Sequence, residues 1–146
     1  KVGIRWYFAT HADGELHWYY ELFYQNKIKI IREDIVNYFT HPCSLAVWLM
    51  DDGYKRNDCD AVRFSTDCFL YKEQEILQEC LFRNFGICSK LHRKGTTWNI
   101  YIPCREMEKM RALCIPYILP SMQYKLPPRN DLVRHPADRI ATFQLL

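Results

Sequence analysis

The sequence lacks the features of a membrane protein, a secreted protein or a disulfide scaffold. No apolar run in its 146 residues approaches the roughly 18 residues that cross a bilayer, and the N-terminus lacks the layout of a signal peptide. The seven cysteines are odd in number and never spaced as C-x-x-C, so neither a zinc site nor a disulfide framework is indicated. We expect an intracellular protein without membrane contacts in a reducing compartment, either a bacterial cytoplasm or the matrix of a mitochondrion or chloroplast.

The chain has no large excess of charge of either sign. Twenty Lys and Arg oppose seventeen Asp and Glu, which leaves a net charge of +3, too little to indicate a polyanionic partner. Hydrophobic residues make up 49% and charged residues 25% of the chain, which is the balance of a globular protein. The placement of the charges, rather than their sum, must therefore indicate any nucleic-acid surface.

The hydrophobic pattern predicts alternating helices and strands. A strand over residues 4–9 is followed by helices over 15–24 and 33–39, and an apolar stripe containing Tyr19 and Phe23 is expected to face the core. The later part of the chain predicts helices over 45–50, 70–84 and 105–113 and strands over 60–65, 87–93 and 97–102. Thr66 or Asp67 is expected to cap the helix over 70–84. Antiparallel strands with helices on one side make an α+β domain whose other sheet face is open.

Basic and polar side chains alternate with apolar ones along the predicted strands, so they should gather on the open face of the sheet. Lys and Arg neutralise phosphates, and Arg, Asn and Ser can hydrogen-bond base edges. The candidate DNA-binding residues on this face are Arg63, Ser65, Lys90, His92, Asn99 and Tyr101, joined by Lys55 and Arg56 after the acidic pair and by Arg93 and Lys94 in the hairpin turn. The alternative is an ordinary solvated sheet face, because surface charge is commonplace.

The predicted helix Leu45–Met50 is apolar almost all round, yet two carboxylates and a glycine follow it directly. The helix dipole opposes negative charge at this end, so Asp51 and Asp52 bring no evident benefit to folding. A local rule broken without compensation indicates a functional site. Both carboxylates are hard oxygen ligands suited to Mg²⁺, which proteins hold through one or two carboxylates plus phosphate oxygens. The alternative is a plain turn.

The segment Leu45–Gly53, which reads L-A-V-W-L-M-D-D-G, resembles the LAGLIDADG motif of homing endonucleases in the branch written L-A-x-W-x-M-D-D-G. Further blocks follow in the order of that family: Phe64-Ser65-Thr66, Phe85-Gly86-Ile87, Ile100-Tyr101-Ile102 and Pro116 onward to the closing Tyr124-Lys125-Leu126-Pro127. The resemblance covers about residues 35–128. It implies an αββαββα unit whose motif helix packs against its counterpart from a second unit.

The resemblance also implies roles for individual residues. Asp52 matches the catalytic, metal-binding acid, and Asp51 is its neighbour and the weaker candidate ligand. Lys125 matches the basic residue at the rim of the active site, where it would polarise the scissile phosphate or the attacking water; the alternative is a surface lysine that contacts phosphate. The expected cofactor is Mg²⁺ or another divalent cation. Val47 stands where the named motif has a small residue, so Ala46 is expected to carry the closest helix approach.

The resemblance divides the chain into three parts. Residues 1–41 resemble the end of a preceding repeat, 42–128 form the endonuclease-like domain and 129–146 are a tail. Lys27 or Lys29 then occupies a place like that of Lys125. The chain is expected to be the C-terminal repeat of a two-repeat protein, or to form a homodimer through its motif helix.

The implied function is a site-specific, metal-dependent endonuclease, intron-encoded, that hydrolyses phosphodiester bonds of double-stranded DNA. One motif supplies one acid, so cutting both strands of a duplex needs a second unit. The alternative is a nucleic-acid-binding module that does not cut, such as an RNA maturase that helps to splice its host intron or a DNA-binding regulator. Intron RNA would then be a partner.

Overall fold

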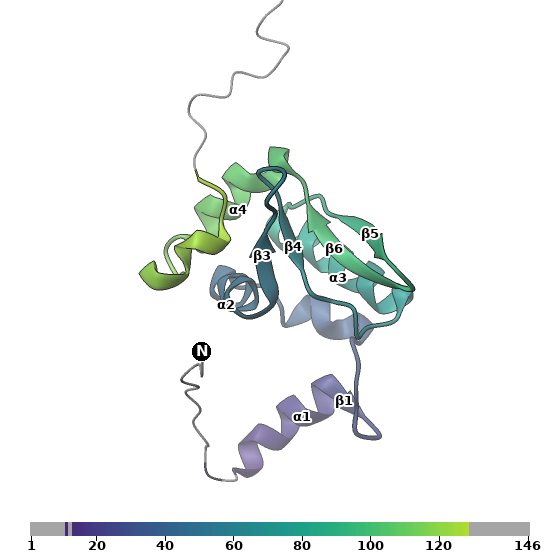
Figure 1. The fold of residues 1–146 in the computed structure, drawn as a ribbon. Coiled ribbons are helices and arrows are strands. Elements are labelled where there is room, and N and C mark those ends of the chain that lie inside the picture. The colour runs from purple at the N-terminus through teal and green to yellow at the C-terminus, as the bar shows by residue number, and fades with distance from the viewer. Residues whose placement is uncertain (1–10, 12, 129–146) are drawn as a thin grey trace, which may run out of the picture.

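A computed structural model describes residue 11 and residues 13–128 of the chain (Figure 1). Its helices are α1 (His17–Phe23), α2 (Pro42–Asp52), α3 (Tyr71–Phe85) and α4 (Met107–Cys114). Its strands are β1 (Tyr24–Gln25), β2 (Ile28–Lys29), β3 (Gly53–Lys55), β4 (Val62–Phe64), β5 (Lys90–Lys94) and β6 (Thr97–Ile102). Four 3-10 turns complete the described part, η1 (Gly14–Leu16), η2 (Glu33–Asn37), η3 (Cys104–Glu106) and η4 (Pro120–Lys125). The strand predicted over 4–9 and the tail 129–146 lie outside the described residues.

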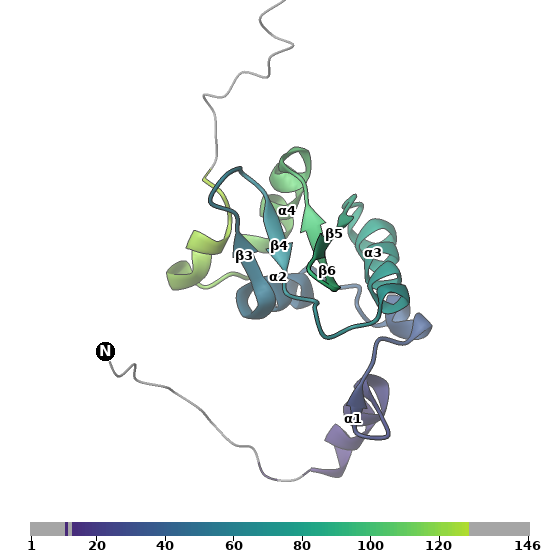
Figure 2. The same cartoon turned by 45° about the vertical axis from the view of Figure 1, so that its right-hand side comes forward.

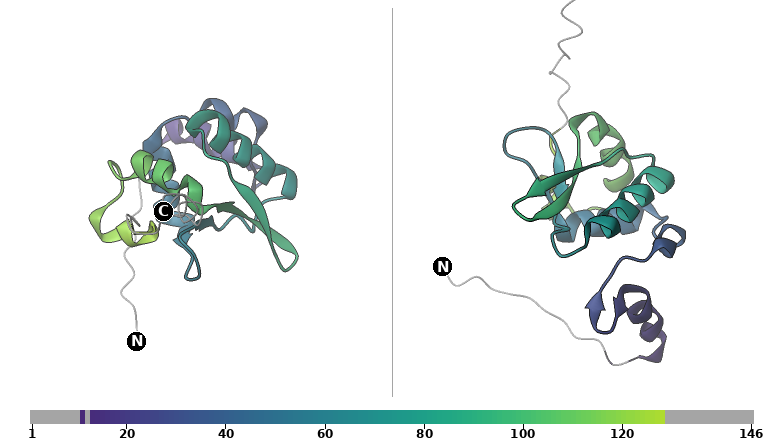
Figure 3. Two further views of the ribbon diagram at one scale, coloured as in Figure 1. Left: turned by 90° about the horizontal axis from the view of Figure 1, so that it is seen from above. Right: turned by 90° about the vertical axis from the view of Figure 1, so that its right-hand side faces the viewer.

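From α2 onward the order is αββαββα, which confirms the predicted α+β fold. The strands form one antiparallel sheet in the order β3-β4-β6-β5. The views in Figure 3 show α2, α3 and α4 on one side of this sheet, and no described helix lies over its other face. The predicted helices over 15–24, 45–50, 70–84 and 105–113 and the predicted hairpin are thus confirmed. The helix predicted over 33–39 is instead the shorter 3-10 helix η2, and β3 adds a strand that begins directly after the acidic pair.

The core lies between the sheet and these three helices. Phe64 of β4 is aligned with Ile100 of β6, and both side chains are fully buried. Helix α2 contributes Leu45 and Leu49, which are also fully buried. Its Trp48 ring stacks on the Phe64 ring with 4.0 Å between ring centroids. Burial of these side chains is the main force that seats α2 on the sheet.

The start of α3 differs from the prediction. The backbone N–H of Leu70 donates to the carboxylate of Glu73, so the cap is built from these residues and not from Thr66 or Asp67. Thr66 is instead buried, where its hydroxyl donates to Gln74 and accepts from the backbone N–H of Ile100. The hydroxyl therefore joins α3 to β6 inside the core.

The N-terminal segment meets the sheet domain mainly through α3. Figures 1 and 2 both show α1 set apart from the sheet. The Asn84 side chain of α3 donates to the carbonyls of Val36 and Phe39, and these bonds hold η2 in place. The apolar stripe predicted for α1 is largely exposed, Tyr19 by 56%, whereas Leu22 is buried. The stripe was predicted from spacing alone, and no described element covers it.

Membrane-spanning character and the state of the cysteines can be described for this part of the chain. None of the helices in the described ranges combines the length and the apolar character that a membrane crossing needs. The seven cysteines, all within those ranges, are free thiols. The two most buried, Cys80 and Cys114, have pKa values raised by burial, to about 11 and about 12, so they behave as small apolar core residues rather than as reactive thiolates.

Gly53 lies at the junction between α2 and β3, where the backbone leaves no space for a side chain. A Cβ at this position would lie 2.5 Å from the carbonyl oxygen of Leu49, which is backbone and cannot rotate away. We expect Gly53→Ala to lower the free energy of unfolding by about 2 kcal/mol, as overpacking does. The measurement is urea unfolding followed by fluorescence. Gly14→Ala is the control, since nothing lies within 4 Å of its Cβ; equal stability of the two variants would contradict the assignment.

Candidate active site and nucleic-acid interface

The C-terminal end of α2 is fixed by contacts on both sides. Helix α2 begins at Pro42, where the His41 ring accepts a hydrogen bond from the backbone N–H of Cys43 at 3.1 Å. It ends where the chain passes straight into β3, and the carbonyl of Asp52 accepts from the backbone N–H of Ser65 at 3.0 Å. The side chains of Asp51 and Asp52 are exposed at this end. Two carboxylates are thus presented to solvent from a rigidly seated helix end.

Lys125 lies beside the same helix end. Its ammonium group, from η4, donates to the carbonyl oxygen of Asp51 at 3.2 Å and to that of Met50. A cation at this position offsets the negative end of the helix dipole. These bonds use two of the three N–H groups of the ammonium. The three residues that the sequence singled out, Asp51, Asp52 and Lys125, are therefore brought together around one helix terminus.

Helix α2 has one covered face and one open face. Ala46 is fully buried in the core of its own chain, so the expectation that Ala46 carries the approach of a second helix was wrong. Val47 is 46% exposed and lies one turn before Asp51. The open face is therefore the one that carries Val47 and ends in the carboxylates. The register of the motif could not show this, because it does not tell which side of the helix the sheet covers.

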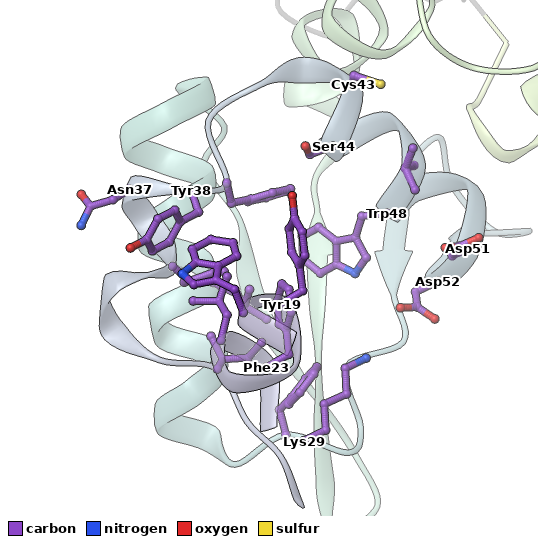
Figure 4. A pocket seen from close by; sticks show the side chains of 18 residues that line it. Tyr19, Phe23, Lys29, Asn37, Tyr38, Cys43, Ser44, Trp48, Asp51 and Asp52 are labelled. Atoms are coloured by element: carbon purple, nitrogen blue, oxygen red, sulfur yellow. The ribbon is translucent and has the colours of Figure 1, made fainter. Parts of the chain in front are cut away.

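The open face of α2 borders a cavity of about 750 Å³, shown in Figure 4. Most of its lining is apolar and comes from α1, η2 and α2, with Tyr19, Phe39 and Trp48 among the larger side chains. At one end the lining becomes charged, with Asp51, Asp52 and Lys29. The cavity therefore joins an apolar surface that a helix could fill to a polar end beside the carboxylates.

The donor set at this end fits part of a divalent cation site. Asp51 and Asp52 supply hard carboxylate oxygens, which suit Mg²⁺ and Ca²⁺. Within the described ranges, no three His, Cys, Asp or Glu side chains gather as a metal-binding group. The remaining ligands would have to be water and oxygens of another molecule, and phosphate is the usual supplier at such sites.

The uncovered sheet face carries a second group of polar side chains. Residues aligned across antiparallel strands share a face, and Tyr101 is aligned with both Arg63 and Lys90. The same alternation adds His92, Lys94 and Asn99 to this face, opposite the buried Ile100 and Ile102. Ser65 follows β4 and is exposed. The predicted polar face thus exists for most of the candidate DNA-binding residues.

Strand register places two candidates on the helix-covered face. Lys55 is aligned with the buried Val62, and Arg93 with Trp98, which packs against Tyr71 of α3. Lys55 lies on this face because β3 starts at Gly53 without an intervening loop, which fixes the side of the sheet to which each residue of β3 belongs. The same parity puts Tyr54, which sequence reasoning missed, beside Arg63 on the open face.

Several cations of the interface have acidic neighbours. Arg56 forms an ion pair with Asp58 and lowers the pKa of that carboxyl to about 2. Lys94 lies 3.3 Å from a carboxylate oxygen of Asp67. Lys90 is exposed at the rim. Because ion pairs that reach solvent are weak, Lys94, and Arg56 through its exposed partner Asp58, can exchange their carboxylates for phosphate oxygens.

Asn99 is the exception on this face. It is 1% exposed, and neither its side-chain oxygen nor its side-chain nitrogen has a hydrogen-bond partner among the described residues. Leaving such an amide unpaired in the interior costs about 1–3 kcal/mol. Polarity and strand position correctly placed Asn99 on the open face, but no sequence signal indicated that neighbouring side chains would cover it.

Comparison with known proteins gives a consistent result. The profile of the LAGLIDADG DNA endonuclease family matches residues 2–110. The chain is 31% identical over 125 residues to the intron-encoded endonuclease ai4 of Dictyostelium discoideum, covering 84% of this chain and 77% of that protein. It is 36% identical over 105 residues to the cytochrome b mRNA maturase bI2 of Saccharomyces cerevisiae, covering 70% of this chain and 24% of the maturase.

A solved structure matches the fold as well. It is the homing endonuclease I-WcaI bound to its DNA recognition sequence, with a TM-score of 0.69 and 34% sequence identity, covering 77% of this chain and 50% of that one. The chain thus spans half of the I-WcaI chain and about a quarter of the yeast maturase. The motif at the end of α2, the αββαββα fold and these matches together establish that the chain belongs to the LAGLIDADG DNA endonuclease family.

Proposed function

We propose that the chain is one unit of a site-specific, intron-encoded DNA endonuclease that hydrolyses phosphodiester bonds with the help of a divalent cation. The observation that carries this proposal is the end of α2, where two exposed carboxylates share one helix terminus with the ammonium of Lys125, which is bonded to the backbone carbonyls of Met50 and Asp51. Negative charge at a helix C-terminus is unfavourable for the isolated chain. It becomes favourable when a cation and a phosphate are present.

Each residue of this site has a distinct role in the proposal. Asp52, with Asp51 as the weaker ligand, holds Mg²⁺ or a similar cation together with phosphate oxygens of the DNA. When bound, such a cation supplies the charge that stabilises the leaving oxygen of a phosphodiester. Lys125 keeps one N–H beyond its two carbonyl contacts, and this group donates to the scissile phosphate or orients the attacking water.

A second unit completes the site. Its motif helix fills the cavity along the open face of α2, against Val47 and Trp48, and brings a second acid next to Asp52. Lys29 lines the charged end of the cavity from the other side and serves that second site as Lys125 serves the first. The match to half of the I-WcaI chain supports a second repeat as the second unit, and we place it before this one. A homodimer through α2 is the other arrangement.

Double-stranded DNA lies along the uncovered face of the sheet. The end of α2 leads directly into the edge strand β3, so a duplex that follows the sheet passes the carboxylates. Lys90 and Arg56 contact phosphates, and the residues at the centre of the face contact base edges. The I-WcaI structure, which is bound to its DNA recognition sequence, supports DNA as the ligand of this fold.

Maturase activity is the second candidate, supported by the 36% identity to the yeast cytochrome b mRNA maturase. In that case the same surface binds intron RNA and Asp52 is not needed for chemistry. The reducing compartment remains a prediction in both cases. Dependence of activity on Asp52 distinguishes the two functions, because only hydrolysis requires the carboxylate.

We expect Asp52→Asn to lower the rate of divalent-cation-dependent cleavage by at least about 100-fold while DNA affinity changes little, because the amide removes the negative ligand. The measurement is cleavage of a plasmid library with randomised inserts, read by sequencing the cut ends. Asp13→Asn is the matched control, since Asn replaces Asp well as the N-cap that Asp13 provides. Undiminished cutting by Asp52→Asn would rule out its catalytic role.

We expect Lys90→Gln to weaken duplex binding by a similar factor for all sequences and to reduce the slope of log affinity against log salt by about 1, as the loss of one phosphate contact does. Fluorescence anisotropy with a labelled duplex between 50 and 200 mM salt measures both quantities. Arg83→Gln serves as control, because Arg83 is exposed on α3, behind the sheet. A slope that responds equally to both variants would contradict the assignment of the face.

A further inference from the structure

The buried amide of Asn99 has no structural explanation in its own surroundings. Nearly all buried side-chain amides are hydrogen-bonded, yet both polar atoms of Asn99 are unpaired and the residue is 1% exposed. Its neighbours along β6, Trp98 and Ile100, face the helices, so Asn99 faces the side without helices. An amide that supported the fold would be bonded to the fold. This one has its full hydrogen-bonding capacity available to another molecule.

The cover over β6 is a bond between the two strands that flank it. Arg63 of β4 and His92 of β5 meet at 3.3 Å between a terminal guanidinium nitrogen and Nδ1. Because β6 lies between β4 and β5, this bond must cross above β6. Arg63 is aligned with Tyr101 and His92 with Asn99, so the bond crosses diagonally over these two residues.

The chemistry of this bond fixes the state of His92. A guanidinium only donates, so His92 must accept through an unprotonated Nδ1 and is neutral. Burial, followed by the charges of Arg63, Arg56 and Lys90, lowers the pKa of His92 below its ordinary value of 6.5. The His92 ring also stacks on the Tyr101 ring, with 4.0 Å between ring centroids. Protonation puts a hydrogen on Nδ1 and a charge opposite Arg63, so the bond is lost as the pH falls through that pKa.

We propose that the Arg63–His92 bond is a latch that covers Asn99 in the chain without nucleic acid, and that duplex DNA opens it so that Asn99 can read an adenine in the major groove. This inference rests on the proposed function, since it assigns a gated reading residue to the DNA-binding face. The latch is one hydrogen bond to a neutral acceptor, supported by the Arg63 guanidinium lying 6.0 Å from the centroid of the Tyr101 ring, and the buried Nε of Arg63 has no hydrogen-bond partner among the described residues.

Two features favour opening by DNA. A phosphate or a guanine edge offers Arg63 the bidentate, charge-assisted partner that one imidazole nitrogen cannot supply. Once uncovered, the Asn99 amide presents one donor and one acceptor side by side, which match N7 and the N6 amino group of adenine. The cost of leaving the amide unpaired in the free chain is then recovered only at a site with adenine in the right place, which makes the residue selective.

The latch itself is tested without DNA by NMR titration of His92. The chain should show His92 with Nδ1 unprotonated in its neutral form and with a pKa below 6.5. Arg63→Gln should raise that pKa and, at fixed pH, speed the solvent exchange of the Asn99 side-chain NH₂ group. Arg83→Gln on α3, a loss of the same charge behind the sheet, should change neither. An Asn99 exchange rate that does not respond to Arg63→Gln overturns the latch.

The reading role is tested by selecting duplexes from a randomised library with the chain and with Asn99→Val. The chain should enrich sequences with adenine at one position, and Asn99→Val should lose the preference at that position alone, by at least about tenfold in enrichment. Because valine removes an unpaired amide from a strand, the variant should unfold at the same or a higher temperature. A purely structural Asn99 predicts the reverse: lower unfolding temperature and unchanged preference.

The outcomes separate the two claims. If the chain enriches sequences and Asn99→Val enriches the same ones, DNA binding stands and the reading role of Asn99 is overturned. If the chain binds no duplex above the level of a random surface, the proposed function fails and this inference fails with it. If Asn99→Val loses the adenine preference at one position and keeps its stability, the result supports both DNA binding by the chain and the reading role of Asn99.

Discussion

The structure depends on how α2 is seated on the sheet. The buried face of α2 carries Leu45, Ala46 and Leu49, all fully buried. At Gly53 the chain turns into β3 with no room for a side chain. This packing fixes which face of α2 stays open and where its last turn points. The exposure of Asp51 and Asp52 follows from the same contacts, because the helix cannot rotate without losing its core.

Unfavourable local features cluster where nucleic acid is expected. Two carboxylates lie at the negative end of a helix, an exposed apolar residue, Val47, lies on its open face, and an unpaired amide is buried in the sheet. Each of them is unfavourable for the isolated chain. Each becomes favourable with one partner: a divalent cation with phosphate, a second motif helix, and a base edge. The proposed two-unit endonuclease on DNA would supply all three partners.

The sequence predicted the elements whose signals are local. The motif Leu45–Gly53, the glycine stop at Gly86 and the hairpin around Gly95 needed only spacing and residue type, and the structure has them in place. The sequence pattern could not predict features that depend on contacts with residues far away in the chain. Contacts between segments far apart in the chain decide three such features: the burial of Ala46, the cover over Asn99 and the exposure of Tyr19. The sheet face of Lys55 was not predictable either, because no strand was predicted where β3 begins.

We propose that the end of α2 is half of a metal-dependent active site. A crystal structure of the chain on duplex DNA with Ca²⁺, which binds such sites through oxygen ligands, tests it directly. We expect a cation about 2.3–2.6 Å from a carboxylate oxygen of Asp52 and from a phosphate oxygen, with a second unit packed against Val47. An Asp52 side chain surrounded by solvent, remote from any phosphate of the bound duplex, would contradict it.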